Sequence, residues 1–382
     1  MIPSGIKSEI NLTKDFPKNI GINRLQLENF RNHSKIDIEV TSPIVALVGS
    51  NGTGKTSILE AISIFSAGKG MRNTSFQDMI KINCNNFFIK IEIYDENRLK
   101  SYISNIYDLS SNKRKIIIND KEFNKVSLLR NSLVLLWISP AMERIFNNSP
   151  SYRRLFLDRI VLAFDQSHSE RLNEFDKLLK ERTKILKEAI NEHYWLDKVE
   201  DNLAKYSVAI AAARLDVISR VSHFFEKPVN CFPRGKIVFK NSVENLLEEK
   251  PALEVETILK EKYFSDRKID AIIGGSSSGS HRTDFFVINK SKDNLSAALC
   301  SSGEQKSLLL SIILSSSRAI YKFLGKTPVL LLDEVYAHLD ENRRISLTSE
   351  LASLNMQAWI TGTEKDQFKN FNGNYCLYNL SK

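Results

Sequence analysis

The chain has few cysteines, and they are not paired along the sequence. Only four occur in 382 residues, and no two of them form a C-x-x-C motif. This excludes a disulfide framework and a cysteine-based zinc site, and reduced thiols favour a cytoplasmic location. The four are Cys84, Cys231, Cys300 and Cys376.

Long apolar stretches are also missing. No uninterrupted run of about 18 apolar residues is present, which is the length that a membrane-spanning helix needs. Residues 1–20 are polar and contain several lysines, without the apolar core of a signal peptide. We therefore expect a cytoplasmic protein without a membrane partner, which begins with an irregular extension over residues 1–20.

Proline and glycine are absent between Glu170 and Phe224. Apolar residues in this stretch recur at alternating steps of three and four, which predicts two helices that pack against each other as a short antiparallel arm. The same stripe is typical of ordinary helix packing, so it does not distinguish an arm from a partner-binding face. The two stripes are Leu172, Phe175, Leu179 and Leu186, and Leu196, Val199, Leu203, Tyr206, Ile210, Ala213 and Val217.

Acidic residues are outnumbered by basic ones. The 54 Lys and Arg against 45 Asp and Glu leave a formal charge of +9, which permits a polyanionic partner such as DNA without requiring one. The length predicts about two domains.

What the sequence does contain is a phosphate-binding loop. Residues 49–56 match G-x-x-x-x-G-K-[ST] at every fixed position. The apolar run at 44–48 predicts a buried strand before the loop, and an apolar stripe over 58–65 predicts a helix after it. Lys55 is expected to reach the β- and γ-phosphates, and Thr56 to hold Mg²⁺. The loop comprises Gly49, Ser50, Asn51, Gly52, Thr53, Gly54, Lys55 and Thr56.

A pair of carboxylates completes a nucleotide site. Asp333 and Glu334 follow the apolar run 329–332, as in a Walker B motif. A buried strand presents such residues at its carboxyl end, where ligands bind in α/β sheets. We expect Asp333 to bind Mg²⁺ and Glu334 to polarise the attacking water as a general base.

Ser301 and Gly303 stand before another apolar helix, between the loop and the carboxylate pair. This order of motifs resembles the ABC-type ATPase head. The resemblance implies an α/β fold, with a mixed β-sheet flanked by helices and a short antiparallel helical arm inserted into it. It also implies an ATP-dependent homodimer, in which Ser301 and Gly303 of one subunit contact the γ-phosphate held by the other.

The same resemblance assigns two further elements. Residues 337–340 (Ala-His-Leu-Asp) occupy the place of the D-loop, with Asp340 near the dimer seam. Thr361 or Thr363 stands where a switch residue would sense the γ-phosphate; both remain candidates.

Within this class, nearly everything after residue 20 resembles the RecF family. Residues 27–32 (LENFRN) are similar to its opening strand, which implies that Arg31 lies at the nucleotide. Residues 139–158 resemble its S-P…R-R-x-F-L-D segment, and residues 281–284 its H-R-x-D turn. The arginines of these segments could contact phosphate or could be structural. The chain departs from the family at Ala141, Ser280, Thr283 and Glu304.

The resemblance implies a weak DNA-linked ATPase of recombinational repair that uses ATP and Mg²⁺. It would bind double-stranded and gapped DNA independently of sequence, with RecR and RecO as partners in loading RecA. A transport ATPase subunit and a nucleotide-switched scaffold are the alternatives. The interval between the two halves of the head is too short for the long coiled coils of SMC proteins.

These motifs predict a domain order. Residues 21–165 and 273–382 would form the head and residues 166–272 the arm. The glycine- and serine-rich residues 274–280 predict a flexible hinge between arm and head.

Overall fold

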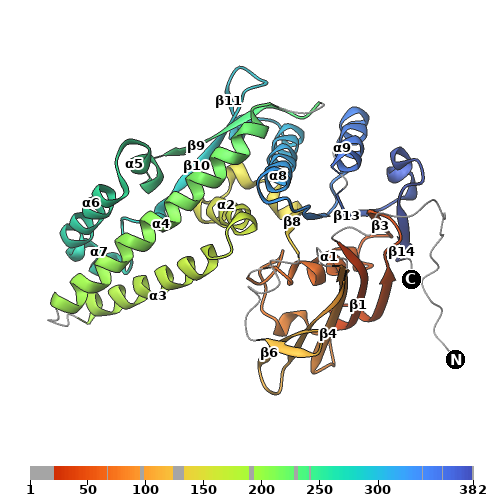
Figure 1. Ribbon diagram of the computed structural model, residues 1–382, viewed down its shortest axis with the longest axis horizontal. Coiled ribbons are helices and arrows are strands. Elements are labelled where there is room, and N and C mark those ends of the chain that lie inside the picture. The colour runs from red at the N-terminus through yellow and green to blue at the C-terminus, as the bar shows by residue number, and fades with distance from the viewer. Residues whose placement is uncertain are drawn as a thin grey trace. The chain divides into compact units, whose positions relative to one another are not determined.

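The computed structural model describes residues 21–66, 68–94, 99–123, 133–188, 193–227, 231–240, 242–337, 339–354 and 356–380. The extension predicted for residues 1–20 and His338 of the predicted D-loop lie outside these ranges. The chain divides into two compact units (Figure 1). The first combines Met1–Met142, Val229–Phe232 and Ser317–Lys382, and the second combines Glu143–Pro228 and Pro233–Ser316.

A five-stranded parallel sheet lies at the centre of the first unit. Its strand order is β14-β3-β13-β12-β8. The strands are apolar along their length because both faces of the sheet are covered, and β3, β8, β12 and β13 are buried at every position. The elements are β3 (Ile44–Val48), α1 (Lys55–Ser63), β8 (Leu135–Ile138), β12 (Val329–Leu332), α9 (Glu341–Ser353), β13 (Ala358–Gly362) and β14 (Cys376–Asn379).

The same unit contains a six-stranded antiparallel sheet in the order β2-β1-β4-β5-β6-β7. The predicted alternation is confirmed in β4, where Ile89 and Ile91 are buried and Lys90 is partly exposed. Asn119 and Asp120, both with positive φ, form the tight turn between β6 and β7. The strands are β1 (Ile22–Phe30), β2 (His33–Glu39), β4 (Asn86–Tyr94), β5 (Lys100–Asp108), β6 (Lys113–Ile118) and β7 (Lys121–Phe123).

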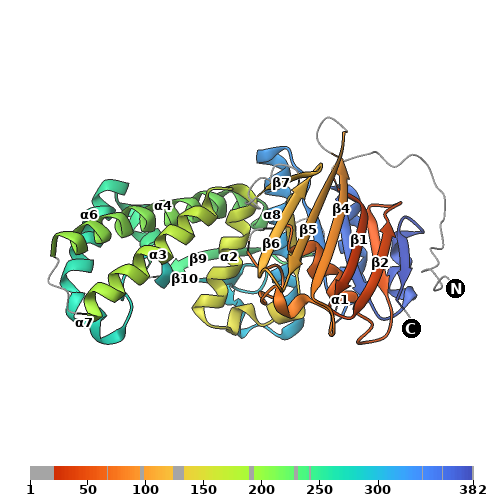
Figure 2. The same ribbon diagram turned by 90° about the horizontal axis from the view of Figure 1, so that it is seen from below.

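The second unit is mainly helical. Its helices α3 and α4 lie side by side (Figure 2) and share a core that includes Phe175, Leu196, Val199, Leu203 and Ile210, so the predicted packing of two helices is confirmed. A small sheet, β11-β10-β9, completes the unit. The elements are α2 (Pro150–Phe164), α3 (His168–Lys187), α4 (His193–Phe225), β9 (Gly235–Lys240), α5 (Val243–Glu249), α6 (Ala252–Ser265), α7 (Arg267–Ile273), β10 (Asp284–Asn289) and β11 (Leu295–Ser296).

Paired charges are buried within this helical unit. Arg214 of α4 donates from Nε and Nη2 to Asp158 at 2.8 and 2.9 Å, and from Nη1 to Glu244 at 3.1 Å. Burial alone would raise the pKa of Asp158, but Arg214 and His168 outweigh it and lower this pKa to about 2. Arg182 of α3 is likewise buried and pairs with Glu200 and Asp270. Such pairs favour one packing arrangement, because any other would leave a buried charge alone.

The prediction of a flexible hinge at residues 274–280 is wrong. Ser276 and Ser280 are buried, and Ser277 donates from both its N–H and its Oγ to Asp270 at 2.9 Å. Serines that composition assigns to a linker here satisfy buried polar groups of the helical unit, which composition cannot reveal.

The helix α8 (Ser302–Leu324) continues from the second unit into the first. By length and composition it is the one helix in the described part of the chain that could cross a membrane, with a mean hydropathy of 1.3. Serines interrupt its apolar residues, which is why no continuous run is seen in the sequence. Because 72% of that apolar window is buried inside the protein, it has the character of a core helix.

We expect Arg214→Gln to lower the free energy of unfolding by about 3–5 kcal/mol, because it leaves Asp158 and Glu244 buried without their cation. Arg220→Gln on the same helix is the matched control. It breaks an exposed pair with Asp216 and should cost about 0.5 kcal/mol or less. Urea denaturation followed by far-ultraviolet circular dichroism checks both values, and equal losses would contradict a stabilising role for the buried cluster.

Candidate nucleotide-binding site

The predicted strand, loop and helix are present in the first unit. The chain leaves β3 at Val48 and enters α1 at Lys55. Gly52 and Gly54 have φ of 85° and 93°, which glycine adopts readily. At Gly54 a Cβ atom would also lie 2.3 Å from Nε2 of His33, the ring nitrogen that lies 3.1 Å from the Gly54 carbonyl oxygen. The conformation of the loop therefore requires glycine at position 54, where the side chain of His33 lies against the backbone.

The ammonium group of Lys55 lies inside this curl. Nζ donates to the carbonyl oxygens of Gly49 at 2.6 Å and Ser50 at 2.9 Å, and the residue is only 5% exposed. Both partners are neutral. A phosphate oxygen, which carries negative charge, would form a stronger bond to the same ammonium group.

The carboxylate pair lies beside the loop. Asp333 follows β12, and its Oδ1 accepts hydrogen bonds from the hydroxyls of Thr56 at 3.0 Å and Thr361 at 2.8 Å. Burial raises the pKa of Asp333, the two hydroxyls oppose this, and neighbouring Glu334 adds to it. A cation at this carboxylate would lower the pKa again.

Thr361 connects the two carboxylate residues. Its hydroxyl donates to Asp333 and accepts from the backbone N–H of Glu334 at 2.7 Å. Thr363, the other candidate switch residue, is exposed, and its N–H donates to Gln367. Of the two, Thr361 is therefore the residue that touches the carboxylate pair. Glu334 itself is exposed and has φ of 50°, a strained backbone conformation that is typical of functional sites.

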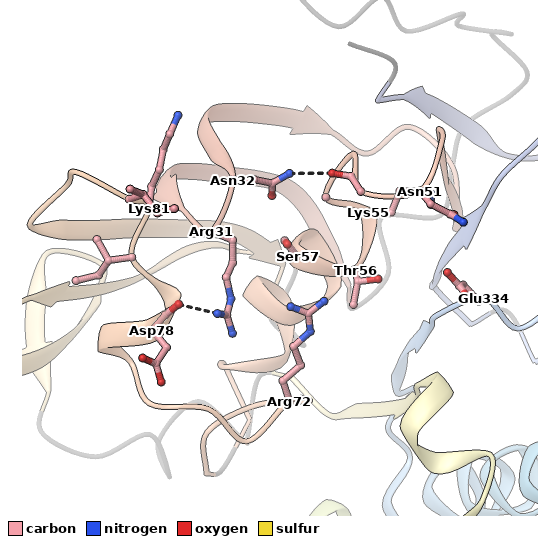
Figure 3. Close-up of a pocket in the computed structure, with 14 residues that line it drawn as sticks. Arg31, Asn32, Asn51, Lys55, Thr56, Ser57, Arg72, Asp78, Lys81 and Glu334 are labelled. Carbon is pink, nitrogen blue, oxygen red and sulfur yellow. Dashed lines mark hydrogen bonds between the residues drawn. The ribbon is translucent and has the colours of Figure 1, made fainter.

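Lys55, Thr56 and Glu334 border a pocket of about 680 Å³, which is in the range of small-ligand sites. Figure 3 shows Thr56, Arg72 and Glu334 among the residues around it. The phosphate loop forms one part of the wall, and the segment from Asp78 to Ile82 forms another.

Arg31 also lines the pocket, where it shares a carboxylate with Arg72. Glu60 of α1 is fully buried and accepts from Nη2 and Nε of Arg31 at 2.5 and 2.8 Å. Nη1 of Arg31 donates to the carbonyl oxygen of Asp78. Arg72 lies farther from Glu60, at 3.6 Å, and its side chain is 43% exposed. One carboxylate against two guanidinium groups leaves a net positive charge within this group of three side chains. Arg31 lies at the pocket as the family resemblance implies, whereas no motif in the sequence marks Arg72.

Thr56 and Asp333 offer hard oxygen donors that fit Mg²⁺. In the described ranges no group of three or more His, Cys, Asp or Glu could hold a metal. Mg²⁺ commonly uses one or two protein oxygens together with phosphate oxygens and water, so the donors present fit a magnesium-nucleotide complex.

Ser301 and Gly303 belong to the second unit, at the start of α8. The Ser301 N–H donates to Glu304 Oε2 at 2.8 Å, and the Glu304 N–H donates to Ser301 Oγ at 3.4 Å. This reciprocal pair is a capping box. Lys292 lowers the pKa of Glu304 to about 2, together with the bonds from Ser301. Glu304, a departure from the family pattern, therefore caps the helix while Ser301 stays exposed.

Asp340 of the predicted D-loop lies in the first unit as the N-cap of α9. Its Oδ1 accepts from the backbone N–H of Arg343 at 2.8 Å, and its side chain is exposed. Asp340 thus has a local role in starting α9, and its exposure leaves it accessible to a second molecule.

The two segments that resemble the RecF family most specifically meet in the second unit. Nε and Nη2 of Arg153 donate to both oxygens of Asp284 at 2.7 and 2.8 Å, and Nη1 of Arg154 donates to the carbonyl of Thr283. His281 and Arg282 both contact the carbonyl oxygen of Ser276. The sequence left open whether these arginines contact phosphate or have a structural role. Their contacts within the protein favour the structural role.

We call the capped turn over residues 301–306 the signature turn. A strand, a glycine loop and a helix, together with an acid pair after a parallel strand of the same sheet and the signature turn, define an ABC-type ATPase head. A family model described as the RecF/RecN/SMC N terminal domain matches residues 21–382. The DNA replication and repair protein RecF of Rickettsia typhi is 36% identical over 362 residues, which cover 93% of this chain and 97% of that protein. RecF of Brucella suis is 34% identical over 372 residues, 96% of each chain. The chain belongs to the RecF family.

Solved structures agree on the fold. A structure of the recombination mediator protein RecF with ATP, of the RecFOR pathway, has a TM-score of 0.80 at 24% identity and covers 90% of this chain and 92% of that one. An Smc head domain from Pyrococcus furiosus has a TM-score of 0.52 at 18% identity, with 91% of each chain covered. The predicted ABC-type fold is confirmed. The curated relatives from Rickettsia typhi and Brucella suis are DNA replication and repair proteins, and neither is a transport ATPase subunit.

The buried His281 predicts a pH dependence of stability. Burial, together with Arg282 and Arg154, lowers its pKa to about 4, against about 6.5 when unfolded. Between these values the unfolded chain binds a proton that the folded chain does not, so stability falls as pH drops from 6.5 to 4, by up to about 3 kcal/mol. His281→Gln should flatten this part of the profile of urea midpoint against pH. His223→Gln, at an exposed histidine, should leave the profile unchanged; equal profiles for all three proteins would contradict the assignment.

Proposed function

We propose that this protein is an ATP-dependent DNA-binding protein of recombinational repair and replication-fork maintenance that acts in the cytoplasm. The observation that carries the proposal is the contact of Thr56 and Thr361 with Asp333, which joins the phosphate loop to the carboxylate pair. A nucleotide in the adjoining pocket would meet all the groups that binding and hydrolysis require.

Each side chain has a role that follows from its position. The loop N–H groups and Lys55 would bind the β- and γ-phosphates, and Arg72 would supply further positive charge at the pocket. Thr56 and Asp333 would hold Mg²⁺, which supplies electrostatic stabilisation to the phosphates when bound. Glu334 would accept a proton from the attacking water as a general base. Thr361, hydrogen-bonded to both acid residues, would keep Glu334 oriented relative to Asp333.

The signature turn supports a composite site. Ser301 is exposed at the N-terminus of a 23-residue helix, where a hydroxyl and the helix dipole favour an anion. In the proposed homodimer Ser301 and Gly303 of each copy approach the γ-phosphate bound by the other. Asp340, exposed at the start of α9, would lie near the seam. ATP then holds the dimer together, and hydrolysis releases it.

We infer that the dimer binds duplex DNA near single-strand gaps through phosphate contacts and without sequence preference. The family membership and the formal charge of +9 support a polyanionic partner. RecR and RecO are the proposed partners in loading RecA, since a relative of the same fold acts in the RecFOR pathway. The scaffold alternative, in which binding alone recruits partners, shares all of these contacts up to hydrolysis.

We expect ATP to strengthen binding to duplex and gapped DNA more than to single strands in a gel-shift assay. Contact with about six phosphates would weaken binding about 10³-fold between roughly 50 and 200 mM salt. Lys55→Ala should abolish the effect of ATP. Binding that is insensitive to both ATP and salt would contradict the proposal.

Glu334→Gln should retain ATP binding and reduce hydrolysis about 10²- to 10⁴-fold, because it removes the base and little volume. ATP-bound dimers should therefore accumulate, as measured by light scattering at saturating ATP and by phosphate release. Glu261→Gln removes an exposed acid of α6 as the matched control and should behave as the unaltered protein. Monomers at saturating ATP would contradict the composite site, whereas full complementation of repair by Glu334→Gln would favour the scaffold alternative.

A further inference from the structure

The first turn of α8 is anchored by side chains that the nucleotide site does not use. Nε2 of Gln305 donates to the carbonyl oxygen of Cys300 at 2.9 Å, directly before the signature serine. Nδ2 of Asn147 donates to Oε1 of Gln305 at 3.5 Å. Nζ of Lys306 donates to Glu143 Oε1 at 2.7 Å. Two residues of the segment 143–147 therefore hold two consecutive residues of this turn.

The pair of Glu143 and Lys306 is placed differently from an ordinary surface ion pair. The side chain of Lys306 is 1% exposed and that of Glu143 is 28% exposed. A buried ammonium group is costly unless a carboxylate lies in good geometry. Positions of the turn that separate Lys306 from this carboxylate are therefore disfavoured, and Ser301 and Gly303 belong to the same turn.

Glu143 also lies shortly after β8, the strand that neighbours the Asp333 backbone. The carbonyl oxygen of Ile138, the last residue of β8, accepts from the backbone N–H of Asp333 at 3.0 Å. Glu143 follows Ile138 after a short helical turn over Pro140–Met142. Glu143 thus reaches Lys306 from the segment that directly follows β8.

We propose that Glu143 and Lys306 are a positioning pair for the composite nucleotide site. They orient the signature turn so that Ser301 and Gly303 can meet the nucleotide held by a second copy. They also tie that turn to the stretch of chain that leaves the strand beside Asp333. The proposal rests on the proposed function, and it assigns the pair to dimer formation rather than to nucleotide binding by one copy.

The test compares two equilibria. Binding of a fluorescent ATP analogue is measured at protein concentrations that keep the protein monomeric, and dimer formation is measured by sedimentation velocity at saturating ATP. All proteins carry Glu334→Gln so that hydrolysis does not interfere. Glu143→Gln should weaken ATP-dependent dimer formation about tenfold or more, the effect of a lost charged hydrogen bond, and should change analogue affinity less than about twofold. Lys292→Gln breaks the exposed pair with Glu304 on the same turn and should change neither quantity appreciably.

If Glu143→Gln is poorly folded because the buried Lys306 loses this carboxylate, the double variant Glu143→Gln with Lys306→Met removes both charges. It should fold, since an apolar pair can replace a buried ion pair, and it should show the same dimer defect. Normal dimer formation by either folded variant overturns the proposal, as does an equal loss of analogue affinity, which marks a general structural role. Failure of the reference protein to dimerise with ATP overturns the proposed function and this inference with it. The reference protein therefore distinguishes the two failures. If it binds the analogue but forms no dimers, the proposed function fails; if it dimerises and the Glu143→Gln variant dimerises equally well, only the role of the pair fails.

Discussion

The buried carboxylate of Asp333 is the group on which the arrangement of the first unit depends. It accepts hydrogen bonds from Thr56 at the start of α1 and from Thr361 on β13, so three segments of chain meet at one oxygen atom. A buried carboxylate is stable only where donors or cations surround it. The parallel sheet provides that place at the carboxyl ends of β12, β13 and β3, where the phosphate loop also begins. The need to surround Asp333 with donors therefore constrains both the strand order of the sheet and the position of the phosphate loop.

The second unit uses buried charge for a different purpose. Arg214, Arg182 and Arg153 each pair with carboxylates from distant parts of the chain. These contacts link α2, α3, α4, α7 and β10, and they account for the segments of the sequence most specific to the RecF family. Residues that resemble a phosphate-binding cluster in the sequence are instead occupied with one another. A specific sequence pattern can thus record a packing requirement rather than a ligand contact.

The two ends of the signature turn illustrate how local and distant contacts combine. Glu304 caps the helix through its neighbour Ser301, which is a local arrangement that the sequence alone can indicate. Lys306 depends on Glu143, more than a hundred and fifty residues earlier, so no local pattern reveals its partner. The turn that carries the exposed Ser301 is therefore held by a local contact with Glu304 and by a distant contact between Lys306 and Glu143.

The sequence alone determined those features of the protein that depend on residues close together in the chain. The phosphate loop, the apolar strands, the alternation in β4 and the stripes of α3 and α4 follow from glycine positions and from the periodicity of buried faces. The tertiary structure alone decided which residues meet across long intervals. Thr361 rather than Thr363 reaches Asp333, and Arg72 joins Arg31 at Glu60. Ser276 and Ser280, which composition assigns to a flexible linker, are buried. Such pairings depend on where the folded backbone brings a donor to a buried acceptor, and composition and spacing along the chain do not encode that distance.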